Sequence, residues 1–297
     1  MTARTLVSPR ARLPLNARSA ENARSYHCVE LELADGRRTT LHVASFDRSA
    51  TRARVVSLGP DATLLRSARE RGWRDAIVGG FFVRPDGVPL GDLRIGGRPQ
   101  PAIAFAEPWG GRRACVHVSG ASVRIALRPE LAAEPAGDLL QAGPLLVRGG
   151  APVFDPRADA EGFSAGAHQF DSDITRGRYP RAALGLSADR ILAVVGDGRS
   201  TRDAGLTLSE LAAAMARLGV WTAINLDGGG SASLVYGGRL RNRPREEHGI
   251  EILGGRPVAT AIAFEPAEPR SLRRLVRRRR EGLALSRGPA RSSALDA

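Results

Sequence analysis

The chain has 297 residues, of which 42% are hydrophobic and 25% charged, a composition that is ordinary for a soluble globular protein. No apolar run approaches the roughly 20 residues that a membrane-spanning helix requires, so the sequence predicts no such helix. The net charge is +13, but residues 25–265 carry only +3 of this charge. Every basic residue is arginine, which indicates a bias of coding composition more than selection for a polyanion. No specific nucleic-acid partner is therefore expected.

The two ends of the chain hold the remaining positive charge. Residues 1–24 form an N-terminal segment that we expect to be flexible, and it lacks the apolar core, roughly 7 to 15 residues long, of a secretory signal. We therefore expect a cytoplasmic protein, with export as the alternative if the start of the chain is misassigned. Residues 266–297 form an Arg-rich tail that we expect to be disordered. The alternative for this tail is a short basic amphipathic helix in weak contact with an anionic surface.

The body of the chain is predicted to contain many short strands and few helices. Residues 26–33 and 38–46 alternate around Asp35-Gly36, which indicates a hairpin. A third strand at 54–58 precedes a helix over 62–71 that ends at Gly72. Further strands are predicted at 75–82, 115–118, 123–127, 139–147, 182–186, 191–195, 220–224, 232–236 and 258–264.

The clearest helix begins at Thr207 and ends at Gly219. Its apolar face is made of Leu208, Leu211, Ala212, Met215 and Leu218. No change of composition divides residues 25–265. We therefore predict a single α+β domain, rich in β structure, between flexible basic tails.

The most informative motif is residues 225–233, in which Asp227 ends an apolar strand and three glycines follow. Glycine allows the chain to turn tightly and a ligand to approach the main chain. The amide groups of Gly228, Gly229 and Gly230, with the Ser231 hydroxyl, would suit an anion. The competing interpretation is a tight hairpin in which the acid only caps the turn.

A second strand, at 190–196, also ends at an acid and a glycine, in Asp197-Gly198-Arg199. Arg181 directly precedes the neighbouring predicted strand, 182–186. If these strands are neighbours, Asp197, Asp227, Arg181 and Arg199 would converge at one sheet end. Such a group of charges is costly to assemble without a ligand or mutual pairing. Ordinary surface ion pairs are the alternative for each arginine taken singly.

The cysteines and histidines carry weaker signals. Cys28 and Cys115 have no partner at metal-binding spacing, and we expect reduced, structural thiols, with a single disulfide as the alternative. Three histidines lie in strand-like segments and are expected to be structural or at the surface: His27, His42 and His117. His168 and His248 lie in loops nearer the motifs, where lining the site is the less favoured role.

An ordered set of motifs resembles the phosphodiester glycosidase domain family over about residues 30–265. The set comprises residues 79–82, 141–146, 180–185, 197–199, 205–211, 225–233 and 242–244. The resemblance implies hydrolysis of a sugar-1-phosphodiester to a free sugar, N-acetylglucosamine in the animal enzyme, and a phosphomonoester. Val78 stands where the family usually has Asn, and Ala182 where Thr is common. These two departures bear on the substrate.

Roles for the site residues follow from the chemistry that the resemblance implies. Carboxylates suit the positive charge that develops on the sugar, and arginines suit the phosphate. Asp227 is predicted as nucleophile or base, with Asp197 as its partner or as an orienting group. The predicted substrate-binding residues are Arg181, Arg199, Asn225, Gly228, Gly229, Gly230, Ser231, Arg243, Gly79 and Gly80.

Two other functions remain open from the sequence. Asp197 and Asp227 could hold one divalent cation in a metal-dependent phosphoesterase, although no cofactor is expected and the metal ligands are unknown. A non-catalytic domain that binds phosphorylated glycans or another anionic polymer is the third candidate. The expected partner is a small or polymeric sugar phosphodiester, and the oligomeric state is left open.

Overall fold

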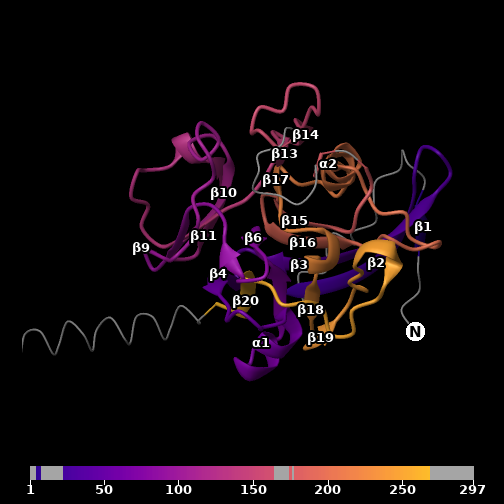
Figure 1. Cartoon of the computed structure of the whole chain (residues 1–297), viewed down its shortest axis with the longest axis horizontal. Helices are drawn as coiled ribbons and strands as arrows, with labels where there is room; N and C mark the ends of the chain where they lie inside the picture. The colour runs from indigo at the N-terminus through magenta and orange to yellow at the C-terminus, as the bar shows by residue number, and fades with distance from the viewer. Residues whose placement is uncertain (1–4, 8–22, 164–173, 176, 268–297) are drawn as a thin grey trace, which may run out of the picture.

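The computed structural model describes residues 5–7, 23–163, 174–175 and 177–267. These residues form one β-rich α+β domain with two α-helices, in agreement with the predicted class (Figure 1). None of the described helices has the length and apolar character to cross a membrane. Most of the predicted flexible ends lie outside the described residues. Within the N-terminal segment, however, β1 (Thr5–Val7) pairs in parallel with β2 (Arg24–Glu32).

The largest sheet has eight strands and is built on the predicted hairpin. In that hairpin β2 pairs antiparallel with β3 (Arg38–Asp47), and Gly36 in the turn has a φ of 79°. The strand order is β1-β2-β3-β16-β15-β17-β13-β14. The other members are β13 (Leu145–Arg148), β14 (Ala151–Pro152), β15 (Arg181–Leu186), β16 (Arg190–Gly196) and β17 (Thr222–Asn225).

Two five-stranded sheets and a two-stranded ribbon complete the domain. One sheet has the order β19-β18-β5-β20-β4 and the other β11-β10-β12-β8-β9. The first contains β4 (Thr51–Ser57), β5 (Asp75–Val78), β18 (Leu234–Tyr236), β19 (Arg239–Leu240) and β20 (Thr260–Pro266). The second contains β8 (Leu93–Ile95), β9 (Arg98–Pro99), β10 (Ala114–Ser119), β11 (Ser122–Leu127) and β12 (Asp138–Gln141), and the ribbon contains β6 (Phe82–Val83) and β7 (Val88–Pro89).

Each face of the main sheet has its own hydrophobic core, because strand side chains alternate between the faces. In β3, Leu41 and Val43 point to the core that α2 (Leu208–Arg217) covers. Ala44 and Phe46 of the same strand pack in the other core, with the two five-stranded sheets. This alternation decides which of the predicted site residues can meet.

Both predicted helices are present, although the first covers residues 64–70 and is shorter than the predicted 62–71. Thr207 Oγ1 accepts the N–H of Glu210, and the Glu210 carboxylate accepts the N–H of Thr207, which forms a capping box at the start of α2. Gly219, with a φ of 78°, follows its last turn. Helix α1 (Leu64–Glu70) is likewise followed by Gly72; in Figure 1 it lies at the bottom of the view, whereas α2 lies in the upper part.

Three predicted strands are shorter than expected. The run 75–82 divides into β5 and β6, because residues 79–81 leave the sheet. The run 139–147 divides into β12 and β13 of different sheets, since Gly143 adopts a φ of 118° that breaks a strand. In the run 232–236 only residues 234–236 form a strand, β18, because the chain is still leaving a 3₁₀ turn (Gly229–Ser231) at residues 232 and 233.

Candidate active site

Three of the sequence motifs meet at one edge of the main sheet. β15 lies between β16 and β17 and runs antiparallel to both, with Arg181 opposite Gly196. The C-terminal ends of β16 and β17 therefore flank the start of β15, about 10 Å apart across two strand spacings. The prediction that the strands leading to Asp197 and Asp227 share a sheet edge is confirmed.

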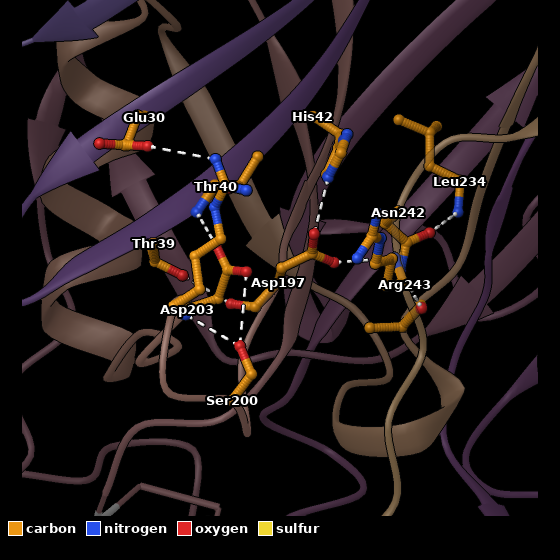
Figure 2. Close-up of polar contacts among 12 residues, drawn as sticks. Glu30, Thr39, Thr40, His42, Asp197, Ser200, Asp203, Leu234, Asn242 and Arg243 are labelled. Carbon is orange, nitrogen blue, oxygen red and sulfur yellow. Dashed lines mark hydrogen bonds and ion pairs between the residues drawn. The ribbon is translucent and has the colours of Figure 1, made fainter. Parts of the chain in front are cut away.

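Asp197 directly follows β16, and its carboxylate is buried with both oxygens bonded (Figure 2). Oδ2 lies 3.0 Å from Nε2 of His42, and Oδ1 accepts a 2.9 Å hydrogen bond from the main-chain N–H of Arg243. The Asp197 N–H donates to the carbonyl of Thr40, which extends the pairing of β16 with β3. His42 and Asp197 are thus diagonal neighbours on one face of the sheet. Asp197 therefore links the end of β16 and His42 of β3 to Arg243, in the segment 242–246.

His42 lies between Asp197 and Tyr26, whose hydroxyl is 2.8 Å from His42 Nδ1. Burial opposes a charge on His42, but the hydrogen bond to Asp197 and the neighbouring Cys28 outweigh burial and raise the pKa of His42 to about 9. The imidazolium is therefore the counter-ion of the Asp197 carboxylate at neutral pH. The same buried setting raises the pKa of Tyr26.

Arg181 begins β15 but does not join Asp197. The two-residue period of β15 and β16 places Arg181 on the face covered by α2 and Asp197 on the opposite face. Arg181 Nε donates to the carbonyl of Leu206 at 2.9 Å, and Nη2 donates to that of Ile174 at 2.8 Å. This position corrects the predicted convergence of Arg181 with both carboxylates and favours a structural role.

Asn225 is buried at the end of β17 and belongs to the scaffold of the site. Its Nδ2 donates to the carbonyl of Gly143 at 2.9 Å, and the Gly143 N–H donates to its main-chain carbonyl at 3.0 Å. Among the described residues its Oδ1 has no hydrogen-bond partner. The amide therefore fixes the corner between β12 and β13, whereas the sequence predicts a substrate contact for it.

The glycine turn after β17 uses its first amide groups within the chain. The Gly228 N–H donates to Asp227 Oδ1 at 2.9 Å, and the Gly229 N–H donates to the carbonyl of Pro180 at 2.8 Å. The predicted anion cradle is therefore wrong for these two amides, because both already have an acceptor. The turn instead fixes Asp227, whose own N–H donates to the carbonyl of Gly79 at 3.0 Å.

Gly79 and Gly80 support this arrangement from behind. Their N–H groups donate to the carbonyl and the hydroxyl of Thr260, each at 2.9 Å. A Cβ on Gly79 would lie 2.3 Å from Thr260 Oγ1, so only glycine fits there. These contacts position the Gly79 carbonyl that holds Asp227, and they give both glycines a structural role in place of the predicted substrate contact.

The Asp227 carboxyl is the titratable group at the centre of the candidate site. Burial raises its pKa to about 6, against the opposing hydrogen bond from Ser231 and the positive charges of Arg256 and Arg84. A carboxyl whose pKa approaches neutrality through burial beside defined charges is typical of an active site. Neither of these two arginines is singled out by the sequence motifs.

Arg256 connects Asp227 to a second carboxylate, that of Glu246. Arg256 Nη1 lies 3.2 Å from Glu246 Oε1, and Arg199 Nη1 lies 4.0 Å from Glu246 Oε2. The charges of Glu246, Arg84, Asp227 and Arg199 all act on Arg256. We call Asp227, Glu246, Arg84, Arg199 and Arg256 the Arg-acid cluster. Its formal charge is +1 when both acids are ionised.

Arg199 and Glu246 both pack on the glycine turn. A Cβ on Gly229 would lie 3.5 Å from Arg199 Nη2, and a Cβ on Gly230 would lie 2.9 Å from Glu246 Cδ. Arg199, in the left-handed region with a φ of 56°, also donates through Nη1 to the carbonyl of Arg245 at 3.0 Å. Gly230 therefore serves the site by leaving room for the Glu246 carboxylate, whereas Gly229 is required for its left-handed backbone, with a φ of 56°.

The remaining predicted residues lie as follows. Arg243 is exposed, and its main-chain N–H binds Asp197. His248 is exposed with a φ of 60°, and His168 lies outside the described residues. Cys28 and Cys115 are not joined in a disulfide, in agreement with the expected reduced state. Where the structure describes the chain, no three His, Cys, Asp or Glu side chains gather as metal ligands.

The sequence reasoning missed Glu246, Arg256 and Arg84. All three lie in loops, and their approach to Asp227 depends on how those loops fold. With 44 arginines in the chain, two more carry no signal of their own. Glu246 follows the Asn-Arg-Pro motif by two residues, which is the only local indication that it lies near the site.

A cavity of about 400 Å³ lies beyond the Gly143 corner and contains no member of the Arg-acid cluster. It is lined mainly by apolar side chains, with Leu145 and Glu161 at one wall. Burial raises the pKa of Glu161 to about 7, and its two oxygens accept the N–H groups of Leu145 and Ala114. Glu161 therefore stabilises the main chain, and the candidate site remains the cluster at the glycine turn.

Comparisons with known proteins give the family of the chain. The family model described as phosphodiester glycosidase matches residues 74–265, which include every member of the Arg-acid cluster. A bovine N-acetylglucosamine-1-phosphodiester alpha-N-acetylglucosaminidase is 30% identical over 188 residues, which are 62% of this chain and 35% of the relative. The chain thus spans about a third of the length of that curated relative.

Solved structures share the fold. The catalytic domain of the zebrafish N-acetylglucosamine-1-phosphodiester alpha-N-acetylglucosaminidase superposes with a TM-score of 0.62 at 18% identity, over 84% of this chain and 85% of that one. A hypothetical protein from Synechocystis gives 0.57 at 19% identity, over 82% and 62%. An exported protein of Burkholderia pseudomallei gives 0.55 at 18% identity, over 78% and 74%.

Proposed function

Because the chain belongs to the phosphodiester glycosidase family, we propose that it hydrolyses the bond between a sugar's anomeric carbon and a phosphodiester oxygen. The products are a free sugar and a phosphomonoester. The observation that carries this proposal is the Asp227 carboxyl at the start of the glycine turn on which Arg199 and Glu246 pack, where the charge of Arg256 acts on it. The name of the bovine relative makes an N-acetylglucosamine-1-phosphodiester the first substrate to test.

The charges of the Arg-acid cluster suit a phosphodiester. Arg84, Arg199 and Arg256 exceed the two carboxylates by one charge, and a phosphodiester brings one negative charge. A guanidinium can bind two phosphate oxygens at once, so Arg256 and Arg199 are suited to hold the phosphate. This assignment keeps the predicted role of Arg199 and gives Arg256 the role predicted for Arg181.

Asp227 and the arginines stabilise opposite charges that develop as the bond is cleaved. As the bond from the anomeric carbon to oxygen breaks, its electron pair moves to the phosphate, and the sugar gains positive charge. The ionised Asp227 faces that positive charge, while the arginines stabilise the added negative charge. The departing phosphomonoester is a stable anion with a second pKa near 6, so it requires little proton donation.

The experiment uses the full chain and a panel of sugar-1-phosphodiesters in water labelled with heavy oxygen. Attack at phosphorus puts the label in the phosphomonoester, whereas hydrolysis at the anomeric carbon leaves the phosphomonoester unlabelled. We expect a free sugar and an unlabelled phosphomonoester, in assays with and without a chelator. Label in the phosphate, with activity lost in the chelator, would establish a metal-dependent phosphoesterase. Binding of the panel without any product would establish a non-catalytic domain.

A further inference from the structure

The proposed reaction calls for two carboxylates, and Asp197 is badly placed to be the second one. Glycosidases commonly use one carboxyl group at the sugar and another that exchanges a proton with water or with the leaving oxygen. Both oxygens of Asp197 are bonded within the protein, to His42 and to the main-chain N–H of Arg243. Its side chain is only 5% exposed. A water molecule entering the site could reach this carboxylate only after those contacts broke.

Glu246 has the position that Asp197 lacks. Its carboxylate lies against the glycine turn, where a Cβ on Gly230 would be 2.9 Å from Oε2 and 3.0 Å from Oε1. The residue before this turn is Asp227, so the turn has one acid on its strand side and another packed on its surface. The Glu246 side chain is 34% exposed, which gives solvent access to its oxygens.

Arg256 couples the two acids electrostatically. Arg256 Nη1 lies 3.2 Å from Glu246 Oε1. The charges of both Glu246 and Asp227 act on the Arg256 guanidinium. A phosphate held by Arg256 and Arg199 would take over guanidinium contacts that Glu246 now makes. The Glu246 oxygens would then be available to accept a proton.

We propose that Glu246 is the second catalytic carboxylate, and that Asp197 is a positioning residue. This inference rests on the proposed glycosidase function. Glu246 accepts one proton from a water molecule as the water oxygen bonds to the anomeric carbon. The electron pair of the breaking carbon–oxygen bond stays on the phosphate, which leaves as a phosphomonoester. Glu246 later returns its proton to solvent.

A purely electrostatic role for Glu246 makes the opposite kinetic prediction. If Glu246 only occupied the arginines until phosphate displaced it, Glu246→Gln would tighten substrate binding and leave kcat unchanged. If it accepts the proton, the same substitution lowers kcat by roughly 100-fold or more and changes KM little. The neighbouring Glu247 is exposed and offers a matched control, Glu247→Gln.

The test measures kcat and KM of wild type, Glu246→Gln and Glu247→Gln on a phosphodiester that the wild type hydrolyses. Glu246→Ala is assayed with and without added formate or azide, and near-ultraviolet circular dichroism checks its fold. We expect loss of kcat in both Glu246 variants, rescue of Glu246→Ala by the added anion, and normal turnover in Glu247→Gln. Turnover by Glu246→Gln within about threefold of wild type would overturn the inference. Failure of the wild type on the whole panel would instead overturn the proposed function.

Discussion

The Asp197 carboxylate holds the main-chain N–H of Arg243 at 2.9 Å while His42 lies 3.0 Å from its other oxygen. This contact joins the end of β16 to residues 242–246, and Glu246 is the last of them. Asn242 holds the same segment from the other side, accepting the Leu234 N–H at 2.9 Å. Asp197 therefore acts on the site through the position of this segment (Figure 2).

Asp197→Asn should lower stability because it leaves the His42 imidazolium without its buried counter-ion. Removing one partner of a buried ion pair typically costs about 3 to 5 kcal/mol, and the amide that remains can keep part of the hydrogen bonding, so we expect about 3 kcal/mol. Urea denaturation at neutral pH measures this loss. The exposed Asp61→Asn is the control and should leave the free energy of unfolding unchanged. Equal stability of the two variants would contradict a structural role for Asp197.

Loss of the His42 proton should make the protein less stable in alkaline solution. Its pKa is about 9 in the folded protein and 6.5 as the ordinary value, so the folded state holds the proton more tightly. The stabilisation is complete below about pH 6.5 and is lost as the pH rises through about 9, an effect on the order of 3 kcal/mol. Denaturation curves across this range should show the decline, and His42→Gln should remove it. An imidazole signal in nuclear magnetic resonance that titrates near its ordinary value would refute this prediction.

Local features of the sequence were enough to predict the hairpin, both helices and the sheet edge. Each of these depends on neighbouring residues, such as the capping box of Thr207 and Glu210 or the alternation in β3. The same alternation separates Arg181 from Asp197. This separation was not predicted, because it depends on the register of β15 against β16, which decides the sheet face on which each side chain lies.

The electrostatic coupling of Asp227 to Arg256, which also contacts Glu246, could not be predicted from the sequence. Asp227 follows β17, whereas Glu246 and Arg256 both lie in the connection between β19 and β20, and loop paths depend on contacts far apart in the chain. The contacts of Gly79 with Thr260 and of Arg199 with the Arg245 carbonyl are examples. Motif order predicted Asp227 as a site residue, but it paired that acid with Asp197, whose carboxylate instead bonds to His42 and to the Arg243 N–H.

Asp227→Asn should abolish turnover and also stabilise the protein. The folded pKa of Asp227, about 6, lies above the ordinary 3.8, so the ionised carboxylate opposes folding at neutral pH. The penalty is at most about 3 kcal/mol at neutral pH, and it disappears as the pH falls through 6 toward 4. Thermal unfolding at both ends of this range should show the variant more stable only at the higher pH. Activity within about tenfold of wild type would remove Asp227 from the mechanism.

Gly230→Ala should disturb the site while leaving the fold intact. The added Cβ would lie 2.9 Å from Glu246 Cδ, closer than such atoms approach, so the Glu246 carboxylate must move. A displacement of this size next to the reacting atoms should lower kcat/KM by about tenfold or more. The control is Gly59→Ala, since a Cβ there would have no atom within 4 Å. Unchanged kcat/KM in Gly230→Ala would show that the position of Glu246 has no influence on turnover.

Arg256→Lys should weaken substrate binding even though it keeps the positive charge. A lysine ammonium cannot reproduce the paired donors of a guanidinium, and it would also loosen the 3.2 Å contact with Glu246. We expect KM for the phosphodiester to rise by about tenfold, with a smaller fall in kcat, because the arginine binds phosphate before and during bond cleavage. Arg124→Lys, in an exposed position of β11, is the matched control and should not change either constant. Inorganic phosphate and the phosphomonoester product should inhibit the wild type more strongly than Arg256→Lys, since both anions use the same guanidinium. Equal inhibition of the two proteins would mean that the phosphate binds elsewhere, and Arg256 would then serve only as the link between Asp227 and Glu246.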